Sequence, residues 1–143
     1  FTLKDQDKND TTLSSYKGRR VILSFYPAAF TGVCTNQVCT VNDAMSSLSA
    51  TDCDVIGISV DSPFSNKAFA DANGITYPLL SDVHREVITA YGVTFDDFAI
   101  KGYTVAQRSV FVVESDGTIG YAWYSDNPGM EPNYEALFAH VGA

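Results

Sequence analysis

The sequence predicts an α/β fold in which a central mixed β-sheet is flanked by helices. Over most of the chain, short apolar runs of strand length alternate with segments of helical periodicity. Near the end, two strand-like segments follow each other directly, joined by a turn at residues 115–117. Helical crossovers join parallel strands, whereas tight turns join antiparallel ones, so the sheet should be mixed. The 143 residues contain no repeat or linker, and we expect residues 1–143 to form one domain.

The predicted sheet begins with a hairpin. Residues 1–14 alternate loosely around a turn at residues 7–10, which places Phe1 and Leu3 facing inward. Two nearly continuous apolar runs then have the length of buried central strands. A short extended segment and two longer strands follow them. These runs and segments cover residues 21–26, 55–60, 79–80, 108–114 and 118–124.

Four helices are predicted, and two of them have clear end signals. Ser62 is placed to cap a helix with Pro63 in its first turn, and Gly74 ends it. Asp82 should cap the next helix, which Gly92 closes. The first and last helices are expected over residues 31–48 and 133–141.

Composition excludes several classes of function. A formal net charge of −8 and a pI near 4.4 argue against nucleic acid as a partner, because its phosphates would be repelled. No apolar run approaches the roughly 18 residues of a membrane span, so no membrane association is expected. The cysteines and histidines lack metal-ligand spacing, and we expect no metal or other cofactor. An odd cysteine count, without a signal peptide in the first residues, favours a reducing compartment, namely the cytoplasm.

Cys34 is the candidate nucleophile. It lies in the first turn of the helix predicted over residues 31–48, at the start of that helix's apolar stripe. The unpaired backbone N–H groups and the positive end of the helix dipole favour an anion there, which stabilises a thiolate relative to a thiol. A buried structural cysteine is the alternative interpretation. The stripe consists of Cys34, Val38, Val41, Met45 and Leu48.

Two further residues, both on the N-terminal side of Cys34, fit the same site. The hydroxyl of Thr31, three residues earlier, is well placed either to cap the helix or to hydrogen-bond the sulfur. Pro27 ends the preceding strand, because without an N–H group it fits the point where strand pairing stops. These two residues and Cys34 therefore form one candidate constellation.

Pro27, Thr31 and Cys34 spell Pro-x-x-x-Thr-x-x-Cys, which resembles the active-site motif of the peroxiredoxins, thiol-dependent peroxidases of thioredoxin-like fold. Other segments follow the family's order, including residues 55–62 and the strand that Arg108 opens. The resemblance covers nearly the whole chain and is greatest to the bacterioferritin-comigratory (Q-type) and AhpE-like branches. It implies a thioredoxin-like fold and the reduction of hydrogen peroxide or small organic hydroperoxides.

The resemblance also implies a role for each candidate residue. In peroxide reduction, the Cys34 thiolate attacks one peroxide oxygen while the other leaves with developing negative charge. Arg108 suits this step because its guanidinium is permanently charged and offers several N–H donors, and the resemblance places it beside Cys34. Thr31 would complete the donors, and Pro27 would shield the sulfur from water. Gln37 either buttresses Arg108 or is an exposed helix residue.

Cys39 is the candidate resolving cysteine. Oxidation of Cys34 would give a sulfenic acid, which a second thiol can capture as a disulfide. Cys39 follows five residues later, as in the Q-type branch. Five helical residues separate two Cα atoms by roughly 8–9 Å, whereas a disulfide tolerates about 7 Å. Resolution within the chain would therefore require the helix to unwind, and an external thiol is the alternative.

The expected partners are a hydroperoxide and a reductant, either thioredoxin or a small thiol, and the family resemblance allows a homodimer. A disulfide oxidoreductase is disfavoured because the chain has no Cys-x-x-Cys motif. A non-catalytic redox sensor or chaperone remains the alternative from another class. Cys53 is expected to be an inert core or rim residue, and both histidines are expected at the surface. Residues 126–129 are assigned first to turn chemistry.

Overall fold

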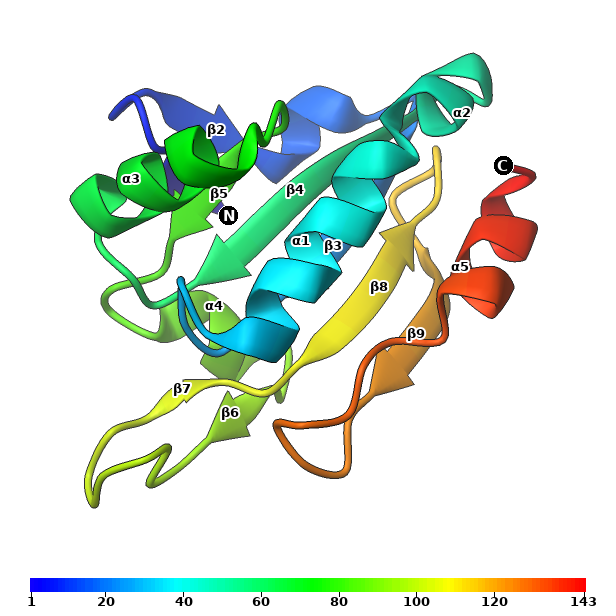
Figure 1. Cartoon of the computed structure of the whole chain (residues 1–143). Helices are drawn as coiled ribbons and strands as arrows, with labels where there is room; N and C mark the ends of the chain where they lie inside the picture. The colour runs from blue at the N-terminus through cyan, green and yellow to red at the C-terminus, as the bar shows by residue number, and fades with distance from the viewer.

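The computed structural model describes residues 1–143 and contains a seven-stranded mixed sheet in the order β2-β1-β5-β4-β3-β8-β9. In its centre β3 lies parallel to β4 and antiparallel to β8, and β5 is parallel to β4 (Figure 1). The expected mixed sheet and the N-terminal hairpin are confirmed. The strands are β1 (Thr2–Lys4), β2 (Asp10–Thr12), β3 (Arg20–Phe25), β4 (Cys53–Ser59), β5 (Leu79–Ser81), β8 (Ser109–Val113) and β9 (Ile119–Tyr124).

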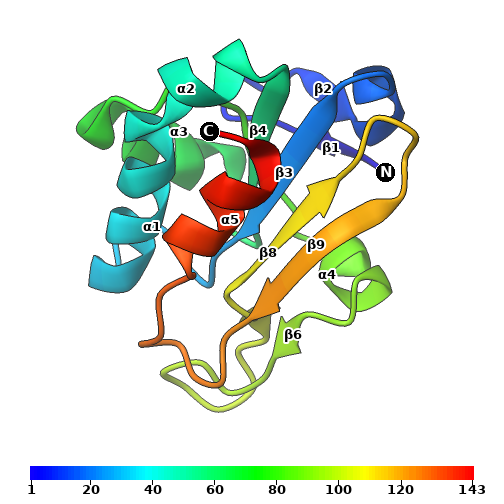
Figure 2. The same cartoon turned by 90° about the vertical axis from the view of Figure 1, so that its right-hand side faces the viewer.

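Helices cover both faces of this sheet. One face is covered by α1 (Gly32–Asp43), α2 (Met45–Ala50), α3 (Pro63–Asn73) and α5 (Tyr134–Val141). The other carries α4 (Glu86–Ala90), a 3-10 helix (Leu13–Tyr16) and a separate hairpin of β6 (Thr94–Phe95) and β7 (Val105–Ala106). Figure 2 shows α1 and α5 on one side of the sheet and α4 on the other. None of the helices combines the length and apolar character required of a transmembrane span.

Strand alternation sorts the core into two halves and positions the site. In β3, Ile22 packs in the half beneath α1, whereas Leu23 packs in the half on the α4 side. In β8, Val110 and Val112 lie beneath α1. Because side chains alternate between faces, Arg108, two residues before Val110, also points toward α1.

Two predicted helices differ from the structure. The helix expected over residues 31–48 is divided at Ala44, whose N–H bonds to Val41 O at 3.1 Å as in a tightened last turn. The helix expected after Asp82 begins only at Glu86, because Arg85 adopts a left-handed conformation with φ 61°. Asp82 still accepts hydrogen bonds from amides of α4, so it caps this helix from a distance.

Candidate active site

Cys34 is the third residue of α1 and is fully buried. The chain leaves the carboxyl end of β3 at Phe25 and enters α1 at Gly32, which brings the first turn of α1 to that end of the sheet (Figure 1). Cys34 packs in the same core half as Val38 and Val41, as its place on the apolar stripe predicts. Its sulfur therefore lies in an environment shielded from water, next to the unpaired amides that begin the helix.

Arg108 reaches this sulfur from β8. Its Nη1 donates to Cys34 Sγ at 3.3 Å and to Gln37 Oε1 at 2.8 Å. The side chain is only 2% exposed, so Arg108 is not a solvated charge at the end of its strand. Gln37 is fully buried as well and contacts Arg108, as the buttress interpretation predicts. Arg108 and Cys34, which lie 74 positions apart in the sequence, are thus in direct contact through Cys34 Sγ.

The other side of the Arg108 guanidinium is held by a backbone carbonyl. Nε and Nη2 donate to Pro128 O at 3.2 and 2.7 Å, respectively. This carbonyl belongs to the loop between β9 and α5, for which the sequence analysis predicts turn chemistry first. A backbone oxygen carries no residue identity, so nothing in the amino-acid pattern of the loop could have indicated this contact.

Gln37 joins Arg108 to the central strand. Its Nε2 donates to Ser24 Oγ at 2.8 Å and to Phe25 O at 3.1 Å, while its Oε1 accepts from Arg108. Ser24 faces α1 because it alternates with Leu23 and Phe25, which lie in the other core half. Ser24 was not identified from the sequence, where a serine in an apolar strand gives only a weak signal.

The buried charge of Arg108 has no carboxylate partner. Its partners are two amide-type oxygens and the sulfur of Cys34, and it takes part in none of the ion pairs of the structure. A buried cation is costly unless an anion or well-aligned acceptors balance it. The arrangement therefore favours negative charge at Cys34 Sγ or on a small oxygen-rich molecule beside it.

Thr31 and Pro27 frame the approach to α1. Thr31 stands at the N-cap position, but its hydroxyl donates to Ala28 O at 3.0 Å and bonds neither the helix amides nor the sulfur. Neither of the two hydrogen bonds considered for this hydroxyl is thus present in the structure. Pro27 is buried directly after β3, at the point where strand pairing stops.

Cys39 lies on the same helix but in a different environment. Its side chain is half-buried, and its Sγ donates a long hydrogen bond of 3.8 Å to Asn73 Oδ1 of α3. Burial, assisted by the carboxylate of Asp43, raises the pKa of the Cys39 thiol, which therefore remains protonated near neutral pH. All three cysteines are free thiols, and α1 is continuous through both Cys34 and Cys39.

Cys53 is confirmed as a core residue. It is fully buried at the start of β4, and burial raises its pKa to about 11. A thiol in this state is a poor nucleophile at neutral pH. Both histidines are exposed, as expected from the sequence.

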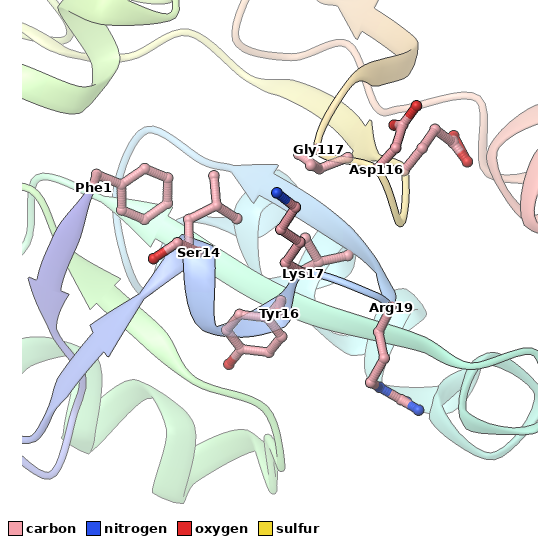
Figure 3. A pocket seen from close by; sticks show the side chains of 11 residues that line it. Phe1, Ser14, Tyr16, Lys17, Arg19, Asp116 and Gly117 are labelled. Atoms are coloured by element: carbon pink, nitrogen blue, oxygen red, sulfur yellow. The ribbon is translucent and has the colours of Figure 1, made fainter.

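A pocket of about 270 Å³ lies far from this constellation (Figure 3). It is lined by residues of the 3-10 helix and the β8–β9 turn, at the end of β3 and β8 opposite Cys34. Its wall includes Val21 and Val113, which are paired across these strands. None of the candidate site residues lines it, so it has no part in the site described above. Charged side chains of both signs surround it, namely Lys17, Arg19, Glu114 and Asp116.

Comparisons with known proteins identify the family of the chain. Residues 1–122 match the model of the AhpC/TSA family. The chain is 46% identical over 127 residues to a Mycobacterium tuberculosis protein named as a peroxiredoxin, covering 87% of this chain and 80% of that protein. Peroxiredoxin Bcp of Escherichia coli is 36% identical over 124 residues, covering 86% and 80% of the two chains.

A solved structure extends the agreement to the fold. The crystal structure of peroxidoxin BcpB from Mycobacterium tuberculosis superimposes with a TM-score of 0.88 at 29% identity, covering 99% of this chain and 91% of that one. The thioredoxin-like fold and the thiol-peroxidase activity implied by the sequence motif are therefore confirmed. Together with the match over residues 1–122, these relatives show that the chain belongs to the AhpC/TSA family and is a peroxiredoxin, a thiol-dependent peroxidase.

Proposed function

We propose that Cys34 is the peroxidatic cysteine and that Arg108 stabilises both its thiolate and the peroxide. The observation that carries this assignment is the 3.3 Å contact between Arg108 Nη1 and Cys34 Sγ at a buried guanidinium without an acidic partner. A thiolate at Sγ supplies the missing negative charge. The site thus holds the nucleophile in its reactive form while excluding bulk water.

The chemical step follows from this arrangement. The Cys34 thiolate attacks one oxygen of the hydroperoxide, and a sulfur–oxygen bond forms as the O–O bond breaks. The departing oxygen leaves as hydroxide or alkoxide and takes up a proton from solvent, which leaves a sulfenic acid on Cys34. Arg108 donates to the oxygens as charge develops. Thr31 joins it once its hydroxyl turns from Ala28 O toward the substrate, and buried Pro27 limits access of water.

We further propose that Cys39 resolves the sulfenic acid. Its thiol attacks the sulfur of the Cys34 sulfenic acid, the hydroxyl leaves as water, and a disulfide forms. The two residues lie on one continuous helix, and Cys39 faces Asn73 rather than Arg108, so part of α1 must unwind first. The raised pKa of Cys39 keeps this thiol unreactive until unwinding exposes it.

Two anchors define which part of α1 can unwind. The Tyr77 hydroxyl donates to Val38 O at 3.0 Å, and Asn42 bonds both Gly74 O and the backbone of Thr76. These contacts hold the helix from Val38 onward against α3 and the segment leading to β5. Gln37 also ties the helix to β3 through Ser24 Oγ and Phe25 O, whereas the residues of α1 before it contact other elements by a hydrogen bond only where Arg108 donates to Cys34 Sγ. The first turn is therefore the part that unwinds, so Cys34 moves toward Cys39 rather than the reverse.

Members of this family draw electrons from thioredoxin-type thiols. For this chain we propose thioredoxin or a small thiol as the reductant, with a reducing compartment such as the cytoplasm suggested by three free thiols. A homodimer that packs near the active-site loops is a further proposal. If Cys39 does not resolve, an external thiol takes its place and the peroxidase activity is kept.

The test is the intact mass of the reduced protein after one equivalent of hydrogen peroxide, with the oxidised residues located by peptide mapping. Loss of two hydrogens with a Cys34–Cys39 linkage is the expected result, and Cys39→Ser should instead gain oxygen at Cys34. Oxygen confined to Cys34 in the wild type would assign resolution to an external thiol. If Cys34→Ser reacts as fast as the wild type, the assignment of Cys34 is wrong.

A further inference from the structure

The loop between β3 and α1 is held in a strained conformation immediately before Cys34. Phe30 has a φ of 66°, in the left-handed region that bulky side chains rarely adopt. Such a backbone conformation is energetically costly and persists only where surrounding contacts hold it. Its ring packs on Phe69 of α3 with a centroid distance of 5.2 Å, although the side chain remains 58% exposed. The loop therefore needs further contacts to keep its shape.

A carboxylate at the end of the neighbouring strand supplies one of them. The backbone N–H of Ala29 donates to Asp61 Oδ2 at 2.8 Å. The hydroxyl of Ser59 donates to the same oxygen, also at 2.8 Å. Asp61 follows β4, which lies parallel to β3, so the carboxylate sits beside the point where the active-site loop leaves the sheet.

Buried polar side chains brace this carboxylate from behind. Ser59 lies 3.5 Å from Asn66 Oδ1, which accepts a hydrogen bond from the Tyr26 hydroxyl at 2.8 Å. Asn66 Nδ2 in turn donates to Ser81 Oγ at 3.3 Å. Tyr26, Ser59 and Asn66 are completely buried. Hydrogen bonds of Asn66 thus link the ends of β3 and β5 to α3, and Ser59, whose proton goes to Asp61, packs against Asn66 from the end of β4. This buried cluster makes a rigid support for the loop.

We propose that Asp61 is a positioning residue for Cys34. Through Ala29 N–H, its carboxylate fixes the strained loop that sets the position of Thr31 and of the first turn of α1. Its charge has the opposite effect, because a second anion near a thiolate disfavours that thiolate. The hydrogen bond, rather than the charge, therefore accounts for an acidic residue here. This inference rests on the proposed role of Cys34.

The two contributions can be separated by substitution. Asp61→Asn keeps an oxygen that can accept from both Ala29 and Ser59 but removes the charge, whereas Asp61→Ala removes both. Asp71→Ala is the matched control, because Asp71 is an exposed residue of α3 paired with Lys67. Stopped-flow fluorescence measures the second-order rate of Cys34 oxidation by hydrogen peroxide, and hydrogen exchange measures the protection of the Ala29 amide.

We expect Asp61→Ala to lower the oxidation rate about tenfold or more and to reduce the protection of the Ala29 amide about tenfold or more. Asp61→Asn should stay within about threefold of the wild type in both measurements, and Asp71→Ala should change neither. Equal loss in both Asp61 variants, or an increased rate in both, would show that the charge matters and would overturn the proposal. So would unchanged Ala29 protection in Asp61→Ala.

Two further measurements keep the test decisive. If Asp61→Ala does not fold, Ser59→Ala replaces it, since it frees the carboxylate from the hydroxyl that orients it and should give a smaller loss of both rate and protection. No change in either quantity would then overturn the proposal. If wild-type Cys34 does not react with peroxide, the proposed function fails, but Ala29 exchange in the Asp61 variants still decides whether Asp61 positions the loop.

Discussion

Replacing Gln37 by leucine should uncouple Arg108 from the central strand while leaving Cys34 in place. Gln37 is completely buried and makes three hydrogen bonds, to Arg108 Nη1, Ser24 Oγ and Phe25 O. Leucine has a similar volume and good helix propensity, so the change removes polar contacts with little change in packing. Arg108 keeps its bonds to Pro128 O and Cys34 Sγ but loses the contact that fixes its orientation.

The expected loss of stability follows from the three hydrogen bonds that Gln37→Leu removes. A hydrogen bond to a charged group contributes about 2 kcal/mol, and each of the two neutral ones contributes about 1 kcal/mol. The added apolar burial of leucine offsets about 1 kcal/mol of this lost stability. We therefore expect the free energy of unfolding to fall by about 3 kcal/mol. If half of the Arg108 contribution, about 1 kcal/mol, is also lost in the transition state, peroxide oxidation of Cys34 slows about fivefold.

Urea unfolding followed by the fluorescence of Trp123, the only tryptophan, measures stability, and stopped-flow oxidation measures reactivity. Gln6→Leu is the matched control, because Gln6 bonds the backbone of Tyr77 and Leu79 away from Cys34. The control should lose stability but keep its oxidation rate. A Gln37→Leu protein within about 0.5 kcal/mol of the wild type, or one that oxidises at the wild-type rate, would refute this account of Gln37.

Two other predictions concern Cys53 and Tyr77. Burial raises the pKa of Cys53 from 9.0 to about 11. The folded protein therefore retains a proton that the unfolded chain releases above about pH 9. The free energy of unfolding should fall by about 2 kcal/mol as the pH rises from about 9 to about 11. Urea unfolding of reduced Cys53→Ala across this range should show a correspondingly smaller fall, and an identical pH dependence would contradict the assignment. Tyr77→Phe removes the hydroxyl that anchors Val38 O, which should weaken α1 by about 1 kcal/mol and speed Cys34–Cys39 disulfide formation several-fold after peroxide addition. A disulfide rate that stays constant while stability falls would show that this anchor does not control unwinding.

Much of the site could be predicted because the identity and spacing of its side chains already indicate their roles. The stripe from Cys34 to Leu48 identified the buried face of α1 and α2, and strand alternation would have placed Arg108 on the side of the sheet beneath α1. The likeness to the peroxiredoxin motif supplied the pairing of Cys34 with Arg108, which sequence separation alone could not give. These features depend on local periodicity and on side-chain identity, both of which are visible in the sequence.

The missed features depend on long-range geometry. The Pro128 carbonyl and the Ser59–Asp61 pair owe their roles to the positions that the folded backbone gives them. Their residue types are common in turns and at strand ends, so they give no signal in the sequence. The start of α4 was misplaced because the left-handed conformation of Arg85 is set by tertiary contacts, including its bond to Thr104 O at 2.8 Å. Local propensity gives no indication of such a conformation in an arginine.

The missing carboxylate beside Arg108 has a consequence for the oxidised enzyme. If Cys34 reacts as a thiolate, as proposed, its conversion to a neutral sulfenic acid or disulfide removes the anion that balances this buried cation in each turnover. An unbalanced buried charge costs on the order of several kcal/mol, which is a large fraction of the stability of a domain of this size. On the proposed role of Cys34, peroxide would therefore act on the protein as loss of a tightly bound anion would, and oxidation would destabilise the closed conformation relative to its thiolate form. Part of the free energy of peroxide reduction would then open the helix, and reduction of the sulfur would close it again.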